Sequence, residues 1–266
     1  MKYVFEIENL NFSYNNKCVF KNLCLQVKEG SFTTILGLNA SGKTTLINIL
    51  LGLTKGNCVV MYQGIPVSLS NLKIINKEVG YVLENYSSDF MAEVVFEEIV
   101  SGLDNITKVE IDDKVGYVIH KLKIKDIMEK PLIKLNNEEK WLVSLAKALV
   151  KKPKVLIIDN GFGALSFKRK NLVLKFLNEL NKKGMTIIMT TSNSDEILYG
   201  NEIIILENKC VITSGGKEEI FKNIELLEGA GFGLPFIVSL SDKLRYYDLV
   251  SKIYFSDEKL VDDLWK

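Results

Sequence analysis

The chain has 266 residues, of which 47% are hydrophobic and 25% are charged, a composition typical of a folded globular protein rather than a disordered one. Its 34 basic and 33 acidic residues give a formal net charge of +1, which excludes a strong overall attraction to nucleic acid or to an anionic membrane. No apolar run approaches the roughly 20 residues of a membrane span, and Glu6 and Glu8 interrupt any signal peptide. We therefore expect a cytoplasmic protein that binds no nucleic acid.

The hydrophobic pattern predicts strands that alternate with helices. Alternating apolar residues over 1–14 indicate edge strands, and a β-rich segment over 32–36 runs through a glycine turn into a helix over 45–51. Further strands are expected at 57–63, 79–83, 155–158 and 185–190, a hairpin at 203–206 and 210–213, and helices at 170–181 and 216–226. This alternation is typical of an α/β fold, in which helices cover both faces of a mostly parallel sheet.

Two segments depart from that alternation. From about residue 91 to 150 the apolar spacing is helical throughout, which predicts an inserted helical subdomain. After residue 226 the pattern loosens around several glycines and then resumes with a short helical run. We therefore predict a main domain over 1–226 and a small C-terminal extension over 227–266.

The four cysteines lie far apart in the sequence, without the C-x-x-C spacing of a metal or redox site. We expect them to be small buried hydrophobic residues in a reducing cytosol. They are Cys18, Cys24, Cys58 and Cys210.

Residues 37–44, Gly-Leu-Asn-Ala-Ser-Gly-Lys-Thr, fit the phosphate-binding pattern G-x-x-x-x-G-K-[ST]. The glycines let backbone N–H groups turn towards a phosphate at the positive end of the following helix, Lys43 reaches the terminal phosphates, and Thr44 binds Mg²⁺. A chance glycine turn is the alternative, but the required strand and helix flank the loop. The expected nucleotide-binding residues are Gly37, Asn39, Ala40, Ser41, Gly42, Lys43, Thr44 and Thr45.

A second signal lies at the end of the apolar segment 154–158, where Asp159 supplies a carboxylate for the other side of the Mg²⁺. Together these motifs resemble the ATP-binding cassette (ABC) family over nearly the whole chain, with 79–85 similar to its Q-loop and 135–150 to its signature segment and following helix. The resemblance implies ATP and Mg²⁺ as cofactors. It also places Tyr14 where the family stacks an aromatic ring on adenine, although Tyr14 is equally compatible with an ordinary strand residue.

The fold implied is that of a P-loop NTPase, the ABC nucleotide-binding domain. It combines a RecA-like mixed sheet, an antiparallel β subdomain, an inserted helical subdomain and the small C-terminal extension.

Residues 84–99 and 231–245 most resemble the ATPase of energy-coupling factor importers, which take up vitamins or metal ions. The resemblance implies a subunit peripheral at the inner face of the cell membrane, docked on a transmembrane coupling component through residues 84–98. It also implies a second ABC ATPase subunit, identical or different, held through the C-terminal extension. A separate substrate-binding membrane subunit would choose the solute.

Several functional positions of the family are substituted in this chain. Glu84 stands in place of the Q-loop glutamine, Asn160 in place of the catalytic glutamate and Ser192 in place of the switch histidine. The signature Ser-Gly-Gly-Gln is replaced by Asn136, Asn137, Glu138 and Glu139. The single histidine, His120, precedes Asp159 and is expected on a helix surface, so no histidine stands at the switch position.

These substitutions have chemical consequences. Asn160 cannot accept a proton from the attacking water, a role that contributes about 10²–10⁴-fold to rate. Glu138 and Glu139 would bring carboxylates towards the partner's nucleotide, and two charges about 4 Å apart interact by roughly 4 kcal/mol at an effective dielectric constant near 20. This repulsion opposes closure unless the two side chains turn away.

We therefore expect an ATP-binding importer subunit whose own hydrolysis is impaired. The alternative is a non-catalytic regulatory or structural protein of the same fold. A cassette protein of DNA repair or translation has no support, because the chain lacks a basic face.

Overall fold

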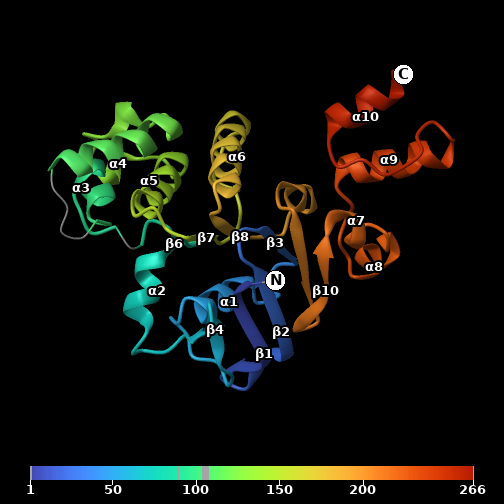
Figure 1. The fold of residues 1–266 in the computed structure, drawn as a ribbon, viewed down its shortest axis with the longest axis horizontal. Helices are drawn as coiled ribbons and strands as arrows, with labels where there is room; N and C mark the ends of the chain where they lie inside the picture. The colour runs from blue at the N-terminus through green and yellow to red at the C-terminus, as the bar shows by residue number, and fades with distance from the viewer. Residues whose placement is uncertain (1, 89, 104–107, 266) are drawn as a thin grey trace.

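The computed structural model describes residues 2–88, 90–103 and 108–265. A small sheet lies at one end of the molecule, below the larger sheet in Figure 1, in the strand order β2-β1-β4-β5. Its strands are β1 (Tyr3–Tyr14), β2 (Lys17–Lys28), β4 (Val60–Tyr62) and β5 (Ile65–Pro66), all paired antiparallel. The prediction of edge strands over 1–14 is wrong. These residues form one long strand, β1, which pairs with β2 on one side and with β4 on the other, because apolar residues of all three strands pack into one core.

The larger sheet has the strand order β10-β9-β3-β8-β7-β6. Its strands are β3 (Phe32–Gly37), β6 (Val79–Val82), β7 (Val155–Ile158), β8 (Thr186–Thr191), β9 (Glu202–Glu207) and β10 (Cys210–Gly216). All neighbours are parallel except the hairpin β9–β10, so the sheet is mixed as predicted.

Alternate residues of the central strands face two different apolar cores. In β7, Val155 and Ile157 pack with the small sheet and α1 (Lys43–Leu50), whereas Leu156 and Ile158 pack with the helical subdomain. Burial on both faces explains the unbroken apolar run of this strand. It also fixes the carboxyl end of β7, and hence Asp159, between the two cores.

The helical subdomain lies to one side of the large sheet and contains α3 (Val95–Val100), α4 (Lys108–Leu122) and α5 (Asn137–Val150) (Figure 1). Short 3₁₀ turns at Lys125–Ile127 and Leu132–Lys134 connect α4 to α5. Two further helices, α2 (Leu72–Glu78) and α6 (Phe167–Lys182), pack beside the large sheet. His120 is exposed on α4, as expected.

The C-terminal part lies near β9 and β10, at the end of the large sheet opposite to the helical subdomain (Figure 1). It consists of α7 (Lys217–Ile220), α8 (Ile224–Gly229), α9 (Phe236–Tyr246) and α10 (Asp257–Leu264), packed on β9 through a third apolar core. The single helix predicted over 216–226 is wrong, because the chain turns at Phe221–Asn223 and begins α8 there.

The cysteines differ from the expectation of small buried residues. Cys24 is exposed and the other three cysteines are only partly buried, so the expectation of buried cysteines is wrong. Cys24 lies on β2, a strand that the pattern did not predict, and it points away from the apolar face of that strand. Among the described residues, no helix combines the length and the apolar character needed to cross a membrane.

Candidate functional site

The predicted phosphate loop connects β3 to α1, and its two glycines are required by the local geometry. A Cβ atom at Gly37 would come within 2.3 Å of the Ser41 Oγ and 3.2 Å of the Leu206 carbonyl oxygen. Gly42 has φ of 99° and caps α1, and a Cβ there would come within 2.8 Å of the Phe20 ring. The loop therefore presents bare backbone at the N-terminus of α1, where an anion is stabilised.

Lys43 is held against this loop. Its Nζ donates hydrogen bonds to the carbonyl oxygens of Gly37 at 2.8 Å and Leu38 at 2.9 Å. Burial lowers the pKa of the Lys43 ammonium, while the carboxylates of Asp159 and Glu84 oppose that shift. A partly desolvated lysine at a glycine-rich loop is arranged to neutralise a phosphate.

Asp159 follows β7 and is almost completely buried, with 3% of its surface exposed. Its Oδ1 accepts a hydrogen bond from the Thr190 Oγ1 at 2.5 Å, but its buried Oδ2 has no hydrogen-bond partner among the described residues. A buried carboxylate oxygen without a partner is costly unless a cation or donor completes it. Oxygen ligands are those that Mg²⁺ prefers, so Asp159 and the Thr44 hydroxyl at the start of α1 fit this ion.

Glu84 and Asn160, predicted at the Q-loop glutamine and catalytic glutamate positions, contact each other in the structure. The Nδ2 of Asn160 donates a hydrogen bond to the Oε1 of Glu84 at 2.9 Å, although the two residues are 76 positions apart. Asn160 has a positive φ of 64°, and its backbone N–H donates to the Thr190 Oγ1 at 2.9 Å. Both side chains are exposed, as is that of Ser192 after β8.

Tyr14 ends β1, and 47% of its surface is exposed. Its ring packs edge-on against Phe12, with 4.8 Å between the ring centroids. This exposure is compatible with the adenine contact predicted from the resemblance.

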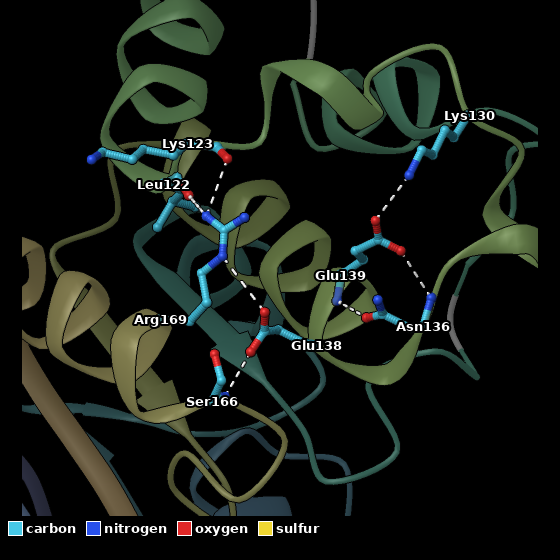
Figure 2. Close-up of polar contacts among 8 residues, drawn as sticks. All are labelled: Leu122, Lys123, Lys130, Asn136, Glu138, Glu139, Ser166 and Arg169. Carbon is cyan, nitrogen blue, oxygen red and sulfur yellow. Dashed lines mark hydrogen bonds and ion pairs between the residues drawn. The ribbon is translucent and has the colours of Figure 1, made fainter.

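The residues predicted as the altered signature form the N-terminus of α5, and the side chains of Asn136, Glu138 and Glu139 make polar contacts there (Figure 2). The Oδ1 of Asn136 accepts a hydrogen bond from the backbone N–H of Glu139 at 2.8 Å, and a Glu139 carboxylate oxygen accepts one from the N–H of Asn136 at 3.0 Å. This reciprocal pair is a capping box. Burial alone raises the pKa of Glu139, but the N–H of Asn136 and the ammonium of Lys130 lower it overall.

Glu138 connects α5 to α6 and, through Arg169, to the end of α4 (Figure 2). Its Oε2 accepts a hydrogen bond from the N–H of Ser166 at 2.6 Å, and its Oε1 lies 3.6 Å from the Arg169 Nε. The Arg169 Nη1 also donates to the carbonyl oxygens of Leu122 at 3.1 Å and Lys123 at 3.2 Å. Both signature carboxylates therefore turn to partners in their own chain, whereas Asn136 and Asn137 remain exposed.

A fully buried carboxylate, Glu98 on α3, orders the segment that follows the Q-loop. It accepts hydrogen bonds from the N–H groups of Met91 and Ala92, both at 2.9 Å, and pairs with Lys147 of α5. Burial alone raises the pKa of Glu98, but the Lys147 ammonium and the two backbone donors lower it overall. The contact connects the loop to the helical subdomain.

Comparison with known proteins identifies this architecture. Residues 20–163, more than half of the chain, match the family model described as ABC transporter. The chain belongs to the ABC transporter family. The energy-coupling factor transporter ATP-binding protein EcfA1 of Mesomycoplasma hyopneumoniae is 32% identical over 272 residues, covering 98% of this chain and 97% of that protein. Its namesake in Mycoplasmoides gallisepticum is 29% identical over 265 residues, covering 98% and 95%.

Solved structures of ABC ATPases share the fold. That of cbiO1 from Clostridium perfringens, part of the ABC transporter complex cbiONQ, has a TM-score of 0.75 at 26% identity and covers 91% of this chain and 100% of its own. A dimeric cassette bound to ADP and phosphate has a TM-score of 0.72 at 20% identity, covering 80% and 98%, and supports the fold alone. The predicted P-loop NTPase fold of the ABC nucleotide-binding domain is confirmed.

In this ABC chain, Glu98 and the partners of the signature carboxylates outside α5 are functional-site features that no sequence motif predicts. The capping box was readable, because Asn136 is followed three residues later by Glu139. No local sequence pattern predicts the contacts of Arg169 with Glu138 or of Lys147 with Glu98, because these residues come together only when the helices pack.

Proposed function

We propose that this chain is the ATP-binding subunit of an energy-coupling factor importer that takes up a vitamin or a metal ion. The observation that supports ATP binding is the buried Asp159, whose Oδ2 has no hydrogen-bond partner among the described residues, together with the phosphate loop and Lys43. Mg²⁺ held by Asp159 and Thr44 would supply charge neutralisation for the phosphates. Similarity over nearly the whole length to energy-coupling factor ATP-binding proteins supports the transport role.

The proposed assembly has four parts. A second ABC ATPase subunit, identical or different, pairs with this chain with help from the extension over 227–266. A transmembrane coupling component docks near residues 84–98, and a separate membrane subunit binds the solute. The chain then lies in the cytoplasm, peripheral to the inner face of the cell membrane, and binds no nucleic acid.

Hydrolysis by this chain is expected to be weak. Asn160 lacks the basicity of a carboxylate, and Ser192 cannot supply the charge of a histidine to the transition state. The contacts of the predicted signature support this expectation. Asn136 and Glu139 cap the N-terminus of α5, and Glu138 accepts a hydrogen bond from Ser166 at the start of α6, so these polar groups are less available to bind a partner subunit's nucleotide.

The second candidate is a non-catalytic regulatory or structural protein of the ABC fold. The internally paired carboxylates of the signature favour it, because they stabilise the chain without nucleotide. Co-purification with a polytopic membrane protein would support the importer subunit, and its absence would support this alternative.

The first test is equilibrium titration of the purified chain with MgATP, beside Lys43→Ala. Binding that is lost in the variant supports a nucleotide-gated subunit. Absence of binding by the unaltered chain would contradict the ATP-binding role. An exposed lysine variant, Lys209→Ala, serves as the matched control and is expected to bind like the unaltered chain.

A further inference from the structure

Glu84 and Asn160 are neighbours because of the register of the large sheet. Strands β6 and β7 are parallel, and Val82 lies opposite Ile158. Each of the two residues follows its strand by the same distance, so both side chains emerge at the carboxyl edge of the sheet. A hydrogen bond of 2.9 Å joins the two side chains, from the Asn160 amide after β7 to the Glu84 carboxylate after β6.

The hydrogen bond orients the carboxylate. Asn160 donates through Nδ2 to the Oε1 of Glu84, which leaves Oε2 without a hydrogen-bond partner in the part of the chain that the structure describes. The positive φ of Asn160 and its N–H bond to Thr190 hold the amide in place. The pair thus consists of a fixed donor and an exposed carboxylate oxygen with lone pairs available.

Strands β3, β8, β7 and β6 are parallel, so the phosphate loop after β3 and Glu84 after β6 leave the large sheet at the same carboxyl edge. The carboxylates of Glu84 and Asp159 favour the charged form of Lys43, against the effect of its burial on the pKa. Two other carboxylates near the site are buried: Asp159 accepts a hydrogen bond from Thr190 and is the proposed ligand of Mg²⁺, and Glu196 pairs with Lys170. Of these three carboxylates, Glu84 is the exposed one.

We propose that Glu84, positioned by Asn160, is the proton acceptor for hydrolysis of ATP by this chain. This inference rests on the ATP binding proposed above. Glu84 takes a proton from water as the water oxygen bonds to the terminal phosphorus, and the bond from that phosphorus to the ADP oxygen breaks with its electron pair. The products are ADP and inorganic phosphate, and Glu84 returns its proton to solvent.

The exchange of positions explains why the pair has one amide and one carboxylate. Two carboxylates 2.9 Å apart would repel each other, and two amides would leave no base. The pair has its carboxylate on the loop after β6 and its amide after β7. A positioned base contributes about 10²–10⁴-fold to rate, so some hydrolysis is retained by this arrangement.

The test compares the full chain with Glu84→Gln in two measurements. The glutamine side-chain oxygen still accepts the Asn160 hydrogen bond, so the variant removes the base and keeps the contact. MgATP affinity is measured by titration, and chemistry by the fraction of bound ATP recovered as ADP in a single turnover. We expect affinity within about twofold and conversion at least about 100-fold slower. Glu8→Gln, on the exposed surface of β1, should match the unaltered chain in both.

The reciprocal variant, Glu84→Gln with Asn160→Glu, restores a carboxylate within the pair and is expected to recover conversion relative to Glu84→Gln alone. Conversion by Glu84→Gln at the unaltered rate would overturn the proposal. So would an unaltered chain that binds MgATP and converts none of it. Failure to bind MgATP is a distinct result, because it overturns the proposed function and the proton acceptor with it.

Discussion

Replacement of Glu98 by alanine is expected to destabilise the chain strongly, because it leaves three donors without their acceptor. The side chain of Glu98 is fully buried, whereas that of Lys147 is 28% exposed. A hydrogen bond to a charged group contributes about 1.5–3 kcal/mol, and Met91 and Ala92 each lose one. Breaking a buried ion pair costs about 3–5 kcal/mol, but Lys147 can regain water. We therefore expect the free energy of unfolding to fall by about 3 kcal/mol.

The assay is thermal and urea unfolding of the unaltered chain and the variant. A loss of about 3 kcal/mol corresponds to a Tm lower by about 6–12 °C for a protein of this size. Glu97→Ala is the matched control, since Glu97 is the exposed neighbour of Glu98 on α3, and its effect should stay within about 0.5 kcal/mol. Equal effects of the two substitutions would refute the reasoning.

The same contact predicts a pH dependence. The pKa of Glu98 is lowered in the folded chain, so its ionised form stabilises the fold above the ordinary glutamate pKa of about 4.3. That contribution is lost as the pH falls through the lower folded-state value. Stability curves of Glu98→Gln should therefore change less with pH in this acidic range than those of the unaltered chain, and parallel curves would contradict the assignment.

Three other predictions follow from the site. Gly37→Ala should weaken MgATP binding in titration by about tenfold or more, because the added Cβ would lie 2.3 Å from the Ser41 Oγ; unchanged affinity would contradict the loop geometry. Asn160→Glu alone should not accelerate ATP conversion in a phosphate-release assay, because it sets a second carboxylate against Glu84; rapid turnover would contradict this. Arg169→Ala should lower the free energy of unfolding in urea by about 1–2 kcal/mol, because the contacts with Glu138 and with two carbonyl oxygens are lost. An unchanged free energy of unfolding would show that these contacts do not stabilise the fold.

Much of the fold could be predicted because its signals are local. The phosphate loop is a continuous run between an apolar strand and an apolar helix, and β7 is apolar throughout because both its faces are buried. The capping box at α5 spans four consecutive residues. By contrast, β2 was missed because only alternate residues of its second half are buried, and lysines and asparagines interrupt the pattern.

The sequence by itself determined the family, and from its motifs it predicts the phosphate-binding residues, the aspartate for Mg²⁺ and the substituted positions. Only the tertiary structure decided which side chains meet. Parallel pairing of β6 with β7 joins Glu84 to Asn160, and the packing of α4, α5 and α6 turns Glu138 towards Arg169. The spacing of apolar residues along the chain predicts helices and strands. Contacts between distant residues depend on sheet register and helix packing, which arise only when the apolar cores form.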